Sequence, residues 1–350
     1  MMNPIETFDI VDGIRKLVDG VHLTRSEARA VMDQIMDGAA SPAQISSFIT
    51  ALRMKGETVE EVTGFAMAMR QRVTPIPVVR QGLLDTCGTG GDGGKTFNIS
   101  TAAAIVAAAG GVPVAKHGNR AVSGKSGSAD VLEVLGIRTQ LVPEQVAQCL
   151  SETGFAFFFA PIFHPAMKHA VGPRREIRIR TVFNLLGPLT NPASAETQIV
   201  GVYDVQLLNT VPEVLANLGV RRAMVVASED GLDEVSVSAP TYVAELRDGR
   251  IRRYIIEPEQ LGLQRHPLAS IAGGTPEHNA RIIEDVFQGA TGGPRDIVLA
   301  NAGAALYIAG KADHWQEGIA LASQLLDTGA AWEKLQQIRR VTEALTHDSR

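Results

Sequence analysis

The sequence predicts an α/β protein: a small all-helical domain, then a larger α/β domain whose central, mainly parallel sheet is flanked by helices. Two patterns support this prediction. Residues 1 to about 72 show only the apolar periodicity of helices, whereas from residue 83 onward short apolar segments typical of strands alternate with helical segments. Such alternation favours parallel strands, because each connecting helix packs back onto the sheet.

Composition and charge exclude several classes of protein. A chain of 350 residues, 45% hydrophobic and 20% charged, is long enough for one large or two smaller domains with substantial cores. Its net charge of -5 argues against a dedicated nucleic-acid-binding protein. No apolar run is long enough to span a membrane, no secretory signal begins the chain, and Cys87 and Cys149 have no disulfide or metal-site spacing. We therefore expect a cytoplasmic protein that binds neither nucleic acid nor membrane.

The N-terminal region contains three capping boxes, in which a Ser or Thr is followed three residues later by Glu or Gln. The pairs are Thr24 with Glu27, Ser41 with Gln44, and Thr58 with Glu61. After each start, apolar residues recur at helical spacing and give each helix one apolar face. These short helices must pack on one another and on a further element, and a surplus apolar face would suit a subunit interface.

Residues 74–79 contain two prolines and form the expected linker to the second domain. Strands are predicted at 83–86, 112–115, 155–159, 199–203, 223–227, 242–246 and 251–256. Helices are predicted at 101–109, 129–135, 143–151, 207–218, 279–287, 296–308, 315–326 and 331–345. The last two strands flank Asp248 and Gly249, a dipeptide typical of tight hairpins, so we expect an antiparallel edge there.

Residues 164–192 interrupt the alternation with a helix start, an arginine cluster and a Gly-Pro-containing end. We expect this segment to leave the sheet domain, pack against the N-terminal helices and supply one wall of a cleft between the domains. The expected organisation is a helical domain at 1–75, onto which 164–192 packs, and an α/β domain at 80–163 and 193–350.

A glycine-rich loop follows the first predicted strand and leads into an alanine-rich helix. Five glycines within residues 88–94 let backbone N–H groups approach a ligand closely. The helix start adds unpaired N–H groups and the positive end of the helix dipole, and Asn98, Ser100 and Thr101 add side-chain donors. The loop fits neither the P-loop nor the dinucleotide fingerprint, so it predicts another type of phosphate site. Asp92 is either a turn residue or an acceptor for sugar hydroxyls or loop amides.

A second glycine-rich loop, residues 116–130, follows the next predicted strand and is expected at the same end of the sheet. Its three basic groups and three serines suggest a second anion site, although alone it would be interpreted as a solvated basic loop. Two such loops suit a ligand with two separated phosphate groups. His117 is either an acid or base or part of the pocket wall.

Asp233 and Glu234 are adjacent carboxylates on a predicted loop, where such residues are usually solvated. Next to a diphosphate they would be natural Mg²⁺ ligands, and Ser100 would add another oxygen. Arg174 and Arg175 either pair with the N-terminal helices, or one of the two arginines binds a substrate carboxylate. No Ser-His-Asp or Cys-His arrangement stands out, so we expect positioning and electrostatics on a phosphorylated substrate.

The stretches 88–92, 96–101, 116–120 and 183–192 resemble motifs of the anthranilate phosphoribosyltransferase family of tryptophan biosynthesis and follow one another in the same order as in that family. The resemblance extends over nearly the whole chain. The resemblance implies hinge segments between a helical and an α/β domain, as in the wider fold group that includes pyrimidine nucleoside phosphorylases. It implies transfer of the 5-phosphoribosyl group from phosphoribosyl pyrophosphate to the amine of anthranilate, with release of pyrophosphate. It also implies Mg²⁺ as cofactor and a homodimer formed through the helical domains.

The resemblance further implies roles for individual residues, none of them an acid, base or nucleophile assigned with certainty. Phosphoribosyl pyrophosphate binding is implied for Gly88, Gly91, Asp92, Thr96, Asn98, Ile99, Ser100, Thr101, Lys116, His117, Gly118, Asn119, Arg120, Ala121, Val122, Ser123, Gly124 and Ser128. Anthranilate binding is implied for Gly88, His117, Asn119 and Arg174, and metal binding for Ser100, Asp233 and Glu234. Gly124 departs from the family pattern, which has a serine there, and this weakens one loop contact at most.

Two other functions remain as alternatives. A nucleoside phosphorylase would share the loop and fold but use phosphate and a nucleobase, and residues 116–119 with Arg174 suit a carboxylated aromatic amine better. A non-catalytic or nucleic-acid-binding relative would be expected to lose the carboxylates of Asp233 and Glu234 or to gain a basic surface. The sequence shows neither change.

Overall fold

The computed structural model describes residues 8–78, 81–90, 95–121 and 124–347. The chain divides into two compact units, each containing two stretches of sequence. One unit comprises Met1–Thr74 and His164–Thr190, and the other comprises Pro75–Phe163 and Asn191–Arg350. Among the described residues, no helix combines the length and the apolar character needed to cross a bilayer.

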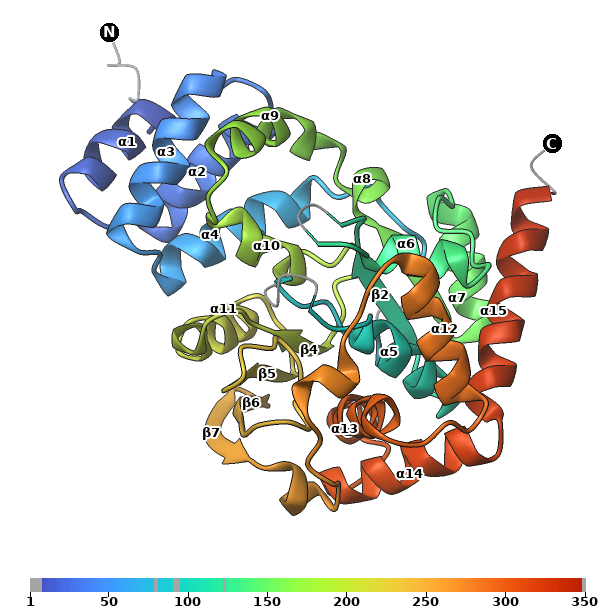
Figure 1. Cartoon of the computed structure of the whole chain (residues 1–350). Helices are drawn as coiled ribbons and strands as arrows, with labels where there is room; N and C mark the ends of the chain where they lie inside the picture. The colour runs from blue at the N-terminus through green and yellow to red at the C-terminus, as the bar shows by residue number, and fades with distance from the viewer. Residues whose placement is uncertain (1–7, 79–80, 91–94, 122–123, 348–350) are drawn as a thin grey trace, which may run out of the picture. The chain divides into compact units, whose positions relative to one another are not determined.

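The first unit is built from helices (Figure 1). They are α1 (Ile10–Val18), α2 (Arg25–Met36), α3 (Pro42–Lys55), α4 (Val59–Gln71), the 3-10 helix η1 (Pro165–Met167), α9 (Lys168–Ile177) and α10 (Phe183–Leu189). The three predicted capping boxes, at the starts of α2, α3 and α4, are confirmed. Helix α9 packs against α2 and α3, and α10 packs against α4, so both helices extend the N-terminal bundle.

Close packing and a buried ion pair hold this bundle together. Helices α2 and α4 approach so closely at Gly64 that a Cβ there would lie 2.4 Å from the backbone oxygen of Arg25. Glu61 is fully buried, and its Oε2 accepts hydrogen bonds from Lys55 Nζ and the N–H of Thr58, each at 2.8 Å. Its Oε1 accepts a hydrogen bond from the N–H of Leu23 at 2.9 Å. The buried charge is therefore paired and hydrogen-bonded, as burial requires.

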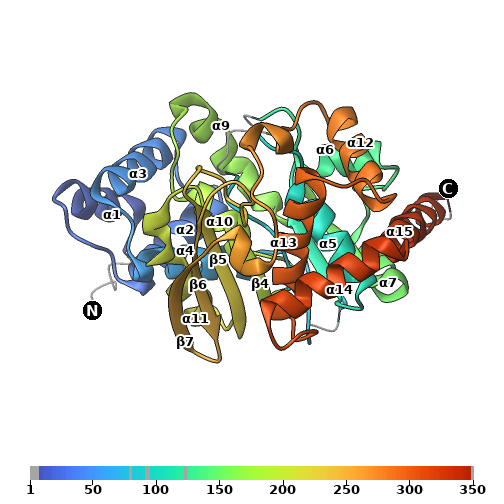
Figure 2. The same ribbon diagram turned by 60° about the horizontal axis from the view of Figure 1, so that its bottom comes forward.

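The second unit places helices around one sheet (Figure 1, Figure 2). Its strands are β1 (Leu84–Asp85), β2 (Val114–Gly118), β3 (Phe155–Phe159), β4 (Thr197–Gly201), β5 (Arg222–Ser228), β6 (Thr241–Arg247) and β7 (Arg250–Ile256). Its α-helices are α5 (Ile99–Ala109), α6 (Ser128–Val134), α7 (Pro143–Thr153), α8 (Ala160–Phe163), α11 (Val211–Asn217), α12 (Pro276–Phe287), α13 (Gly293–Ile308), α14 (Trp315–Asp327) and α15 (Ala330–His347). Short 3-10 helices are η2 (Val205–Leu208), η3 (Pro258–Leu261) and η4 (Leu268–Ile271).

The sheet has the strand order β3-β2-β1-β4-β5-β6-β7. The first five strands in this order are parallel, and β6 and β7 continue it as an antiparallel pair. The turn between β6 and β7 has positive φ at Asp248 (48°) and Gly249 (79°), as a two-residue type I′ hairpin requires. The predicted fold class and the antiparallel edge are thus confirmed. The order also reverses direction between β1 and β4, and such a switch point is where open α/β sheets bind ligands.

Both faces of the parallel part of the sheet are covered. Along β3, Phe155, Phe157 and Phe159 join the core that also contains the apolar residues of α5 and α13. The alternate residues Ala156 and Phe158 join a second core on the opposite face, together with residues of α7. A strand buried on both faces reads as a continuous apolar run, which explains the sequence of β3.

Several predicted boundaries of helices and strands are wrong. The helix predicted at 207–218 is divided into η2 and α11, because Pro212 lacks an N–H and is accommodated only in the first turn of a new helix. Strand β2 runs from Val114 to Gly118 rather than over 112–115, because it pairs with β3 along this whole length, so Lys116, His117 and Gly118 lie on the strand and not in the second loop. Strand β4 ends at Gly201 rather than at residue 203, and helix α5 starts at Ile99 rather than at residue 101. This earlier start places Ser100 and Thr101 in the first turn of α5.

We predict that Glu61→Gln destabilises the helical unit by about 3 kcal/mol, because it leaves the ammonium group of Lys55 buried without its countercharge. The free energy of unfolding, measured by urea titration, tests this prediction. The matched control is Glu60→Gln in the same helix turn, where the side chain is 54% exposed and pairs with Arg25. An exposed pair contributes less than about 1 kcal/mol, so equal losses in the two variants would contradict the role of burial.

Candidate active site

Three loops meet at the switch point of the sheet. Thr89, in the loop after β1, donates its N–H to the carbonyl oxygen of Gly201 at the end of β4, at 2.8 Å. In the same loop, the N–H of Gly90 donates to Oδ2 of Asp233, in the loop after β5, at 2.9 Å. The loops after β1, β4 and β5 are therefore held together at the carboxyl ends of parallel strands, by backbone groups and by the carboxylate of Asp233.

The start of α5 is the second part of the site. Glu234 Oε1 accepts a hydrogen bond from the N–H of Ser100 at 3.1 Å. This N–H belongs to the first turn of the helix, where amides have no partner within the helix and the dipole attracts anions. Asn98 occupies the N-cap position, but its side chain makes no capping hydrogen bond. The N–H of Ser100 is therefore satisfied by a side chain from the loop after β5, 134 positions further along the chain.

The donor set of Ser100, Asp233 and Glu234 fits a magnesium ion. Two neighbouring carboxylates reach amides of the loop and helix that are expected to bind phosphate. Mg²⁺ prefers oxygen ligands and is typically held by one or two carboxylates together with phosphate oxygens of the substrate. The structure thus brings together the three residues predicted to bind metal.

Gly201 is a site residue that the sequence analysis missed. A Cβ at this position would lie 1.6 Å from the carbonyl oxygen of Asp233 and would displace the loop that carries Asp233 and Glu234. A Cβ at Gly88 would lie 3.2 Å from both Oδ2 of Asp233 and the carbonyl oxygen of Gly201. The available signal was a glycine inside a predicted strand, which often marks a close backbone approach.

Asn301 is a second residue that was missed. It is buried in α13, and its Oδ1 accepts from the N–H of Val235 at 3.0 Å while its Nδ2 donates to the carbonyl oxygen of Val235 at 2.9 Å. Val235 directly follows Glu234, so this amide fixes the backbone at the end of the carboxylate pair. A lone asparagine in the otherwise apolar run 297–308 was the available signal, because buried amides need partners.

Lys116 lies on β2 with its ammonium group buried behind the glycine loop. Its Nζ donates to Oγ1 of Thr86 at 3.0 Å and to the carbonyl oxygen of Thr86 at 3.3 Å. Burial lowers the pKa of Lys116, because removal from water disfavours the charged form. Thr86 in turn donates its hydroxyl to the carbonyl oxygen of Ser100 at 3.1 Å. A buried cation is therefore linked through one side chain to the start of α5.

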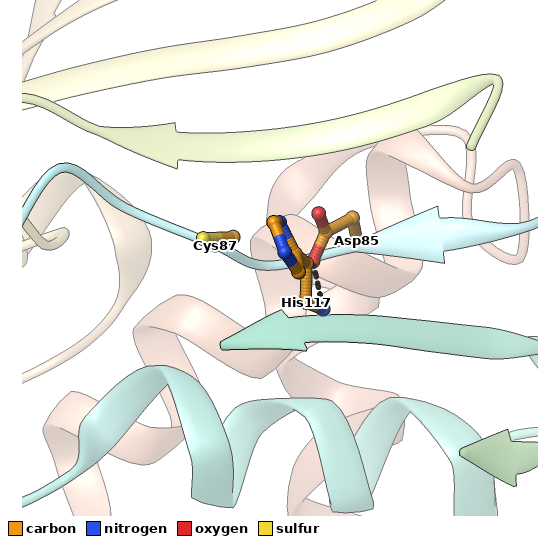
Figure 3. A group of neighbouring side chains, drawn as sticks. All are labelled: Asp85, Cys87 and His117. Carbon is orange, nitrogen blue, oxygen red and sulfur yellow. Dashed lines mark hydrogen bonds between the residues drawn. The ribbon is translucent and has the colours of Figure 1, made fainter. Parts of the chain in front are cut away.

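Asp85, Cys87 and His117 form a group of possible metal ligands near the same place, with their ligand atoms within 4.8 Å of one another (Figure 3). The group does not suit a metal ion. Asp85 uses both carboxylate oxygens, accepting from the N–H of His117 at 3.1 Å and from Nδ2 of Asn191 at 2.8 Å. Burial raises the pKa of the Cys87 thiol, so this group stays protonated and is a weak metal ligand. These residues instead fix the base of the glycine loop.

The second loop is organised by its own hydrogen bonds. Arg120 pairs with Oδ1 of Asp130 at 3.0 Å and with Oε1 of Glu133 at 2.7 Å. Asp130 Oδ2 also accepts from the N–H of Ala121 at 2.9 Å, and Ser128 donates its hydroxyl to the carbonyl oxygen of Asn119 at 3.3 Å. Arg120 therefore shapes this loop through carboxylates of α6.

Gly91, Asp92, Val122 and Ser123 lie outside the described residues. The other predicted residues of the two loops lie between the end of β1 and the start of α6: Gly88, Thr96, Asn98, Ile99, Ser100, Thr101, Lys116, His117, Gly118, Asn119, Arg120, Ala121, Gly124 and Ser128.

Arg174 belongs to helix α9 of the helical unit. Its guanidinium group lies over the ring of Phe183, with Cζ 5.2 Å from the ring centroid. Burial lowers the pKa of Arg174. Among the residues that the structure describes, no carboxylate lies within ion-pair distance of it. A partly buried cation without a countercharge is suited to bind an anionic group from outside the chain.

Comparison with known protein families finds two matches. Residues 11–73 match the helical bundle domain of a glycosyl transferase family, and residues 80–332 match the a/b domain of the glycosyl transferase family. Anthranilate phosphoribosyltransferase of Brevibacillus brevis is 56% identical over 336 residues, which is 96% of this chain and 98% of that protein.

Solved structures give a consistent result. Anthranilate phosphoribosyltransferase from Thermus thermophilus is 44% identical, with a TM-score of 0.90 over 95% of this chain and 99% of that one. The enzyme of the same name from Saccharomyces cerevisiae, solved in complex with PRPP and Mg, is 29% identical. Its TM-score is 0.87, over 96% of this chain and 98% of that one.

Proposed function

The chain belongs to the anthranilate phosphoribosyltransferase family, and we propose the roles by which its residues carry out this reaction. The enzyme transfers the 5-phosphoribosyl group from phosphoribosyl pyrophosphate to the amine of anthranilate, a step of tryptophan biosynthesis, and its cofactor is Mg²⁺. The products are N-(5-phosphoribosyl)anthranilate and pyrophosphate. One observation carries the proposal: Asp233 and Glu234 reach the same backbone amides that a diphosphate needs.

The phosphoribosyl pyrophosphate site comprises the two loops after β1 and β2, with the residues predicted there. Backbone amides of the glycine loop and of the first turn of α5 donate to phosphate oxygens, as helix N-termini commonly do. The buried ammonium of Lys116 raises the positive potential behind the loop. Ser100, Asp233 and Glu234 hold Mg²⁺, which neutralises charge developing on the departing pyrophosphate.

The acceptor needs little activation. The amine of anthranilate is neutral near pH 7, so no strong base is required to prepare it for attack on the ribose C1. The protein therefore acts chiefly by aligning the amine with the carbon that it attacks. Such alignment lowers a barrier by roughly 7–11 kcal/mol in favourable cases. Gly88, His117 and Asn119 contact anthranilate in this proposal, and Arg174 pairs with its carboxylate.

Loss of anthranilate fluorescence after addition of phosphoribosyl pyrophosphate tests the proposal. We predict a Mg²⁺-dependent loss, and a fall in rate of at least about a hundredfold in the double variant Asp233→Asn/Glu234→Gln, because charge stabilisation by a metal ion contributes several kcal/mol. Added Mg²⁺ should not restore the rate. The matched control is Glu229→Gln, an exposed carboxylate near the start of the same loop, which should keep the wild-type rate. Undiminished activity of the double variant would remove both residues from the metal site.

For Arg174→Ala we predict a KM for anthranilate that is about 10- to 100-fold higher, with little change in the KM for phosphoribosyl pyrophosphate, because a charge-assisted hydrogen bond to a carboxylate contributes about 1.5–3 kcal/mol. Steady-state kinetics with each substrate varied in turn measure both constants. Arg175→Ala is the matched control, since Arg175 is the exposed neighbour in the same helix. If the two KM values of Arg174→Ala rise together, the assigned role is wrong.

We also propose that the enzyme is a homodimer formed through the helical unit. Three apolar side chains near the ends of α1 and α3 are unusually exposed: Val18 at 71%, Val21 at 47% and Met54 at 84%. A contact of 2.7 Å between Nδ1 of His22 and Nζ of Lys55 brings the segment after α1 next to the end of α3, so these side chains lie in neighbouring turns. An apolar patch of this kind marks an interaction surface.

Sedimentation velocity tests the dimer. We predict a dimer for the wild-type chain and a shift to monomer in Val18→Glu/Met54→Glu, because the new carboxylates would be desolvated at the interface. The control Val134→Glu changes a 43% exposed valine in the other unit and should remain dimeric. A monomeric wild-type chain, or a dimer in the double variant, would contradict this interface.

The enzyme's place of action is proposed to be the cytoplasm. Cys87 and Cys149 are both free thiols, which suits a reducing compartment. Recovery of the tagged enzyme mainly in a membrane or secreted fraction of lysed cells would contradict this location.

A further inference from the structure

Asn98, Ser126 and Asn279 form a hydrogen-bonded group, here called the asparagine clasp, that joins three segments far apart in the sequence. Asn98 precedes α5, Ser126 lies in the loop before α6, and Asn279 lies in the first turns of α12. We propose that Asn279 is a positioning residue that holds the two phosphate-binding loops at the spacing phosphoribosyl pyrophosphate requires. This inference rests on the proposed function of those loops.

The side chain of Asn279 is 1% exposed and both of its amide groups are used. Its Nδ2 donates to Oδ1 of Asn98 at 3.0 Å, across 181 positions of sequence. Its Oδ1 accepts a hydrogen bond from the N–H of Gly274 at 2.7 Å. A buried amide that loses a partner is strongly disfavoured, so the position of Asn279 and that of Asn98 depend on each other.

Asn98 is also hydrogen-bonded to the second loop. Its Oδ1 also accepts from the hydroxyl of Ser126 at 3.0 Å, and its Nδ2 donates to the carbonyl oxygen of Ser126 at 3.2 Å. The side chain of Asn98 is thus occupied by Ser126 and Asn279, which accounts for the lack of a capping hydrogen bond at the start of α5. Asn98 therefore acts on the ligand through the position of α5.

The backbone before α12 follows the glycine loop closely. Thr96 and Ala272 form an antiparallel bridge, and the N–H of Gly273 donates to the carbonyl oxygen of Lys95 at 2.9 Å. A Cβ on Gly273 would lie 2.2 Å from the carbonyl oxygen of Thr96, so only glycine fits there. Helix α12 also packs against α6, the helix that follows the second loop (Figure 1, Figure 2). Asn279 is therefore placed where both loops can be fixed by one side chain.

The variant Asn279→Asp isolates the link to Asn98. Aspartate keeps an oxygen for the N–H of Gly274 and nearly the same shape, but its ionised carboxylate has no donor for Oδ1 of Asn98. Binding of phosphoribosyl pyrophosphate in the presence of Mg²⁺ is measured by calorimetry. We expect the dissociation constant to rise about tenfold, as loss of one buried hydrogen bond predicts, while the KM for anthranilate at saturating phosphoribosyl pyrophosphate stays within about twofold of wild type.

The pH dependence of phosphoribosyl pyrophosphate binding provides a second test, because a general loss of stability would not produce the expected pH dependence. A buried carboxyl group is protonated more easily than an exposed one, and the protonated form regains an O–H donor. The ratio of the variant's dissociation constant to that of wild type should therefore fall between pH 8 and about pH 5.5. A ratio that is the same at both pH values would contradict the role of the Nδ2 donor.

Thr342→Val is the matched control for lost stability. It removes a buried hydroxyl of α15 that accepts from the N–H of Arg138 at 3.2 Å, in the same unit but outside the proposed site. The control should bind phosphoribosyl pyrophosphate as wild type does. Equal rises in the control and in Asn279→Asp would assign the effect to stability and overturn the inference.

Ser126→Ala tests the clasp from the partly exposed loop, where folding is least at risk. It removes one hydrogen bond to Oδ1 of Asn98 and should weaken binding in the same direction as Asn279→Asp. If the wild-type chain binds phosphoribosyl pyrophosphate and either variant binds it equally well, the inference is overturned but the proposed function is not. A wild-type chain that does not bind phosphoribosyl pyrophosphate would overturn the proposed function, and the inference with it.

Discussion

Two hydrogen bonds between backbone amides and carboxylates are the interactions on which the proposed active site depends. Gly90 donates to Asp233, and Ser100 donates to Glu234. Each amide is a donor that a phosphate also needs, and each carboxylate is an oxygen ligand that Mg²⁺ prefers. Under the proposed function, a diphosphate that enters with its metal ion exchanges amide–carboxylate pairs for amide–phosphate and metal–carboxylate pairs.

This exchange requires loops whose backbones are held in place, and buried polar side chains provide that support. Asn301 fixes Val235 at the end of the carboxylate pair, and Asn191 holds Asp85 at the base of the glycine loop. Asn279 contacts Asn98 before α5. An amide side chain is suited to this task because it offers both donors and an acceptor without a charge to neutralise.

The helical unit shows how the surroundings of a cation decide its role. Lys55 is buried and paired with Glu61, so its charge is satisfied within the fold and stabilises it. Arg174 is partly buried against the ring of Phe183 and has no carboxylate among the described residues within ion-pair distance. The Lys55–Glu61 pair balances its charges without a ligand. The second arrangement is suited to a substrate carboxylate, which supports the proposal that Arg174, rather than its exposed neighbour Arg175, binds anthranilate.

The sequence by itself determined the fold class, the helix starts with capping boxes, the β6–β7 hairpin and the glycine loop, because each depends on residues close together in the chain. It also indicated the carboxylates at Asp233 and Glu234. Only the tertiary structure decided that Gly201 must lack a side chain, and that Asn301 and Asn279 support the loops. Their partners lie tens to hundreds of positions away, and packing alone brings them within hydrogen-bond distance. A glycine in a strand or an asparagine in a helix indicates a close approach or a buried partner, but it does not identify that partner.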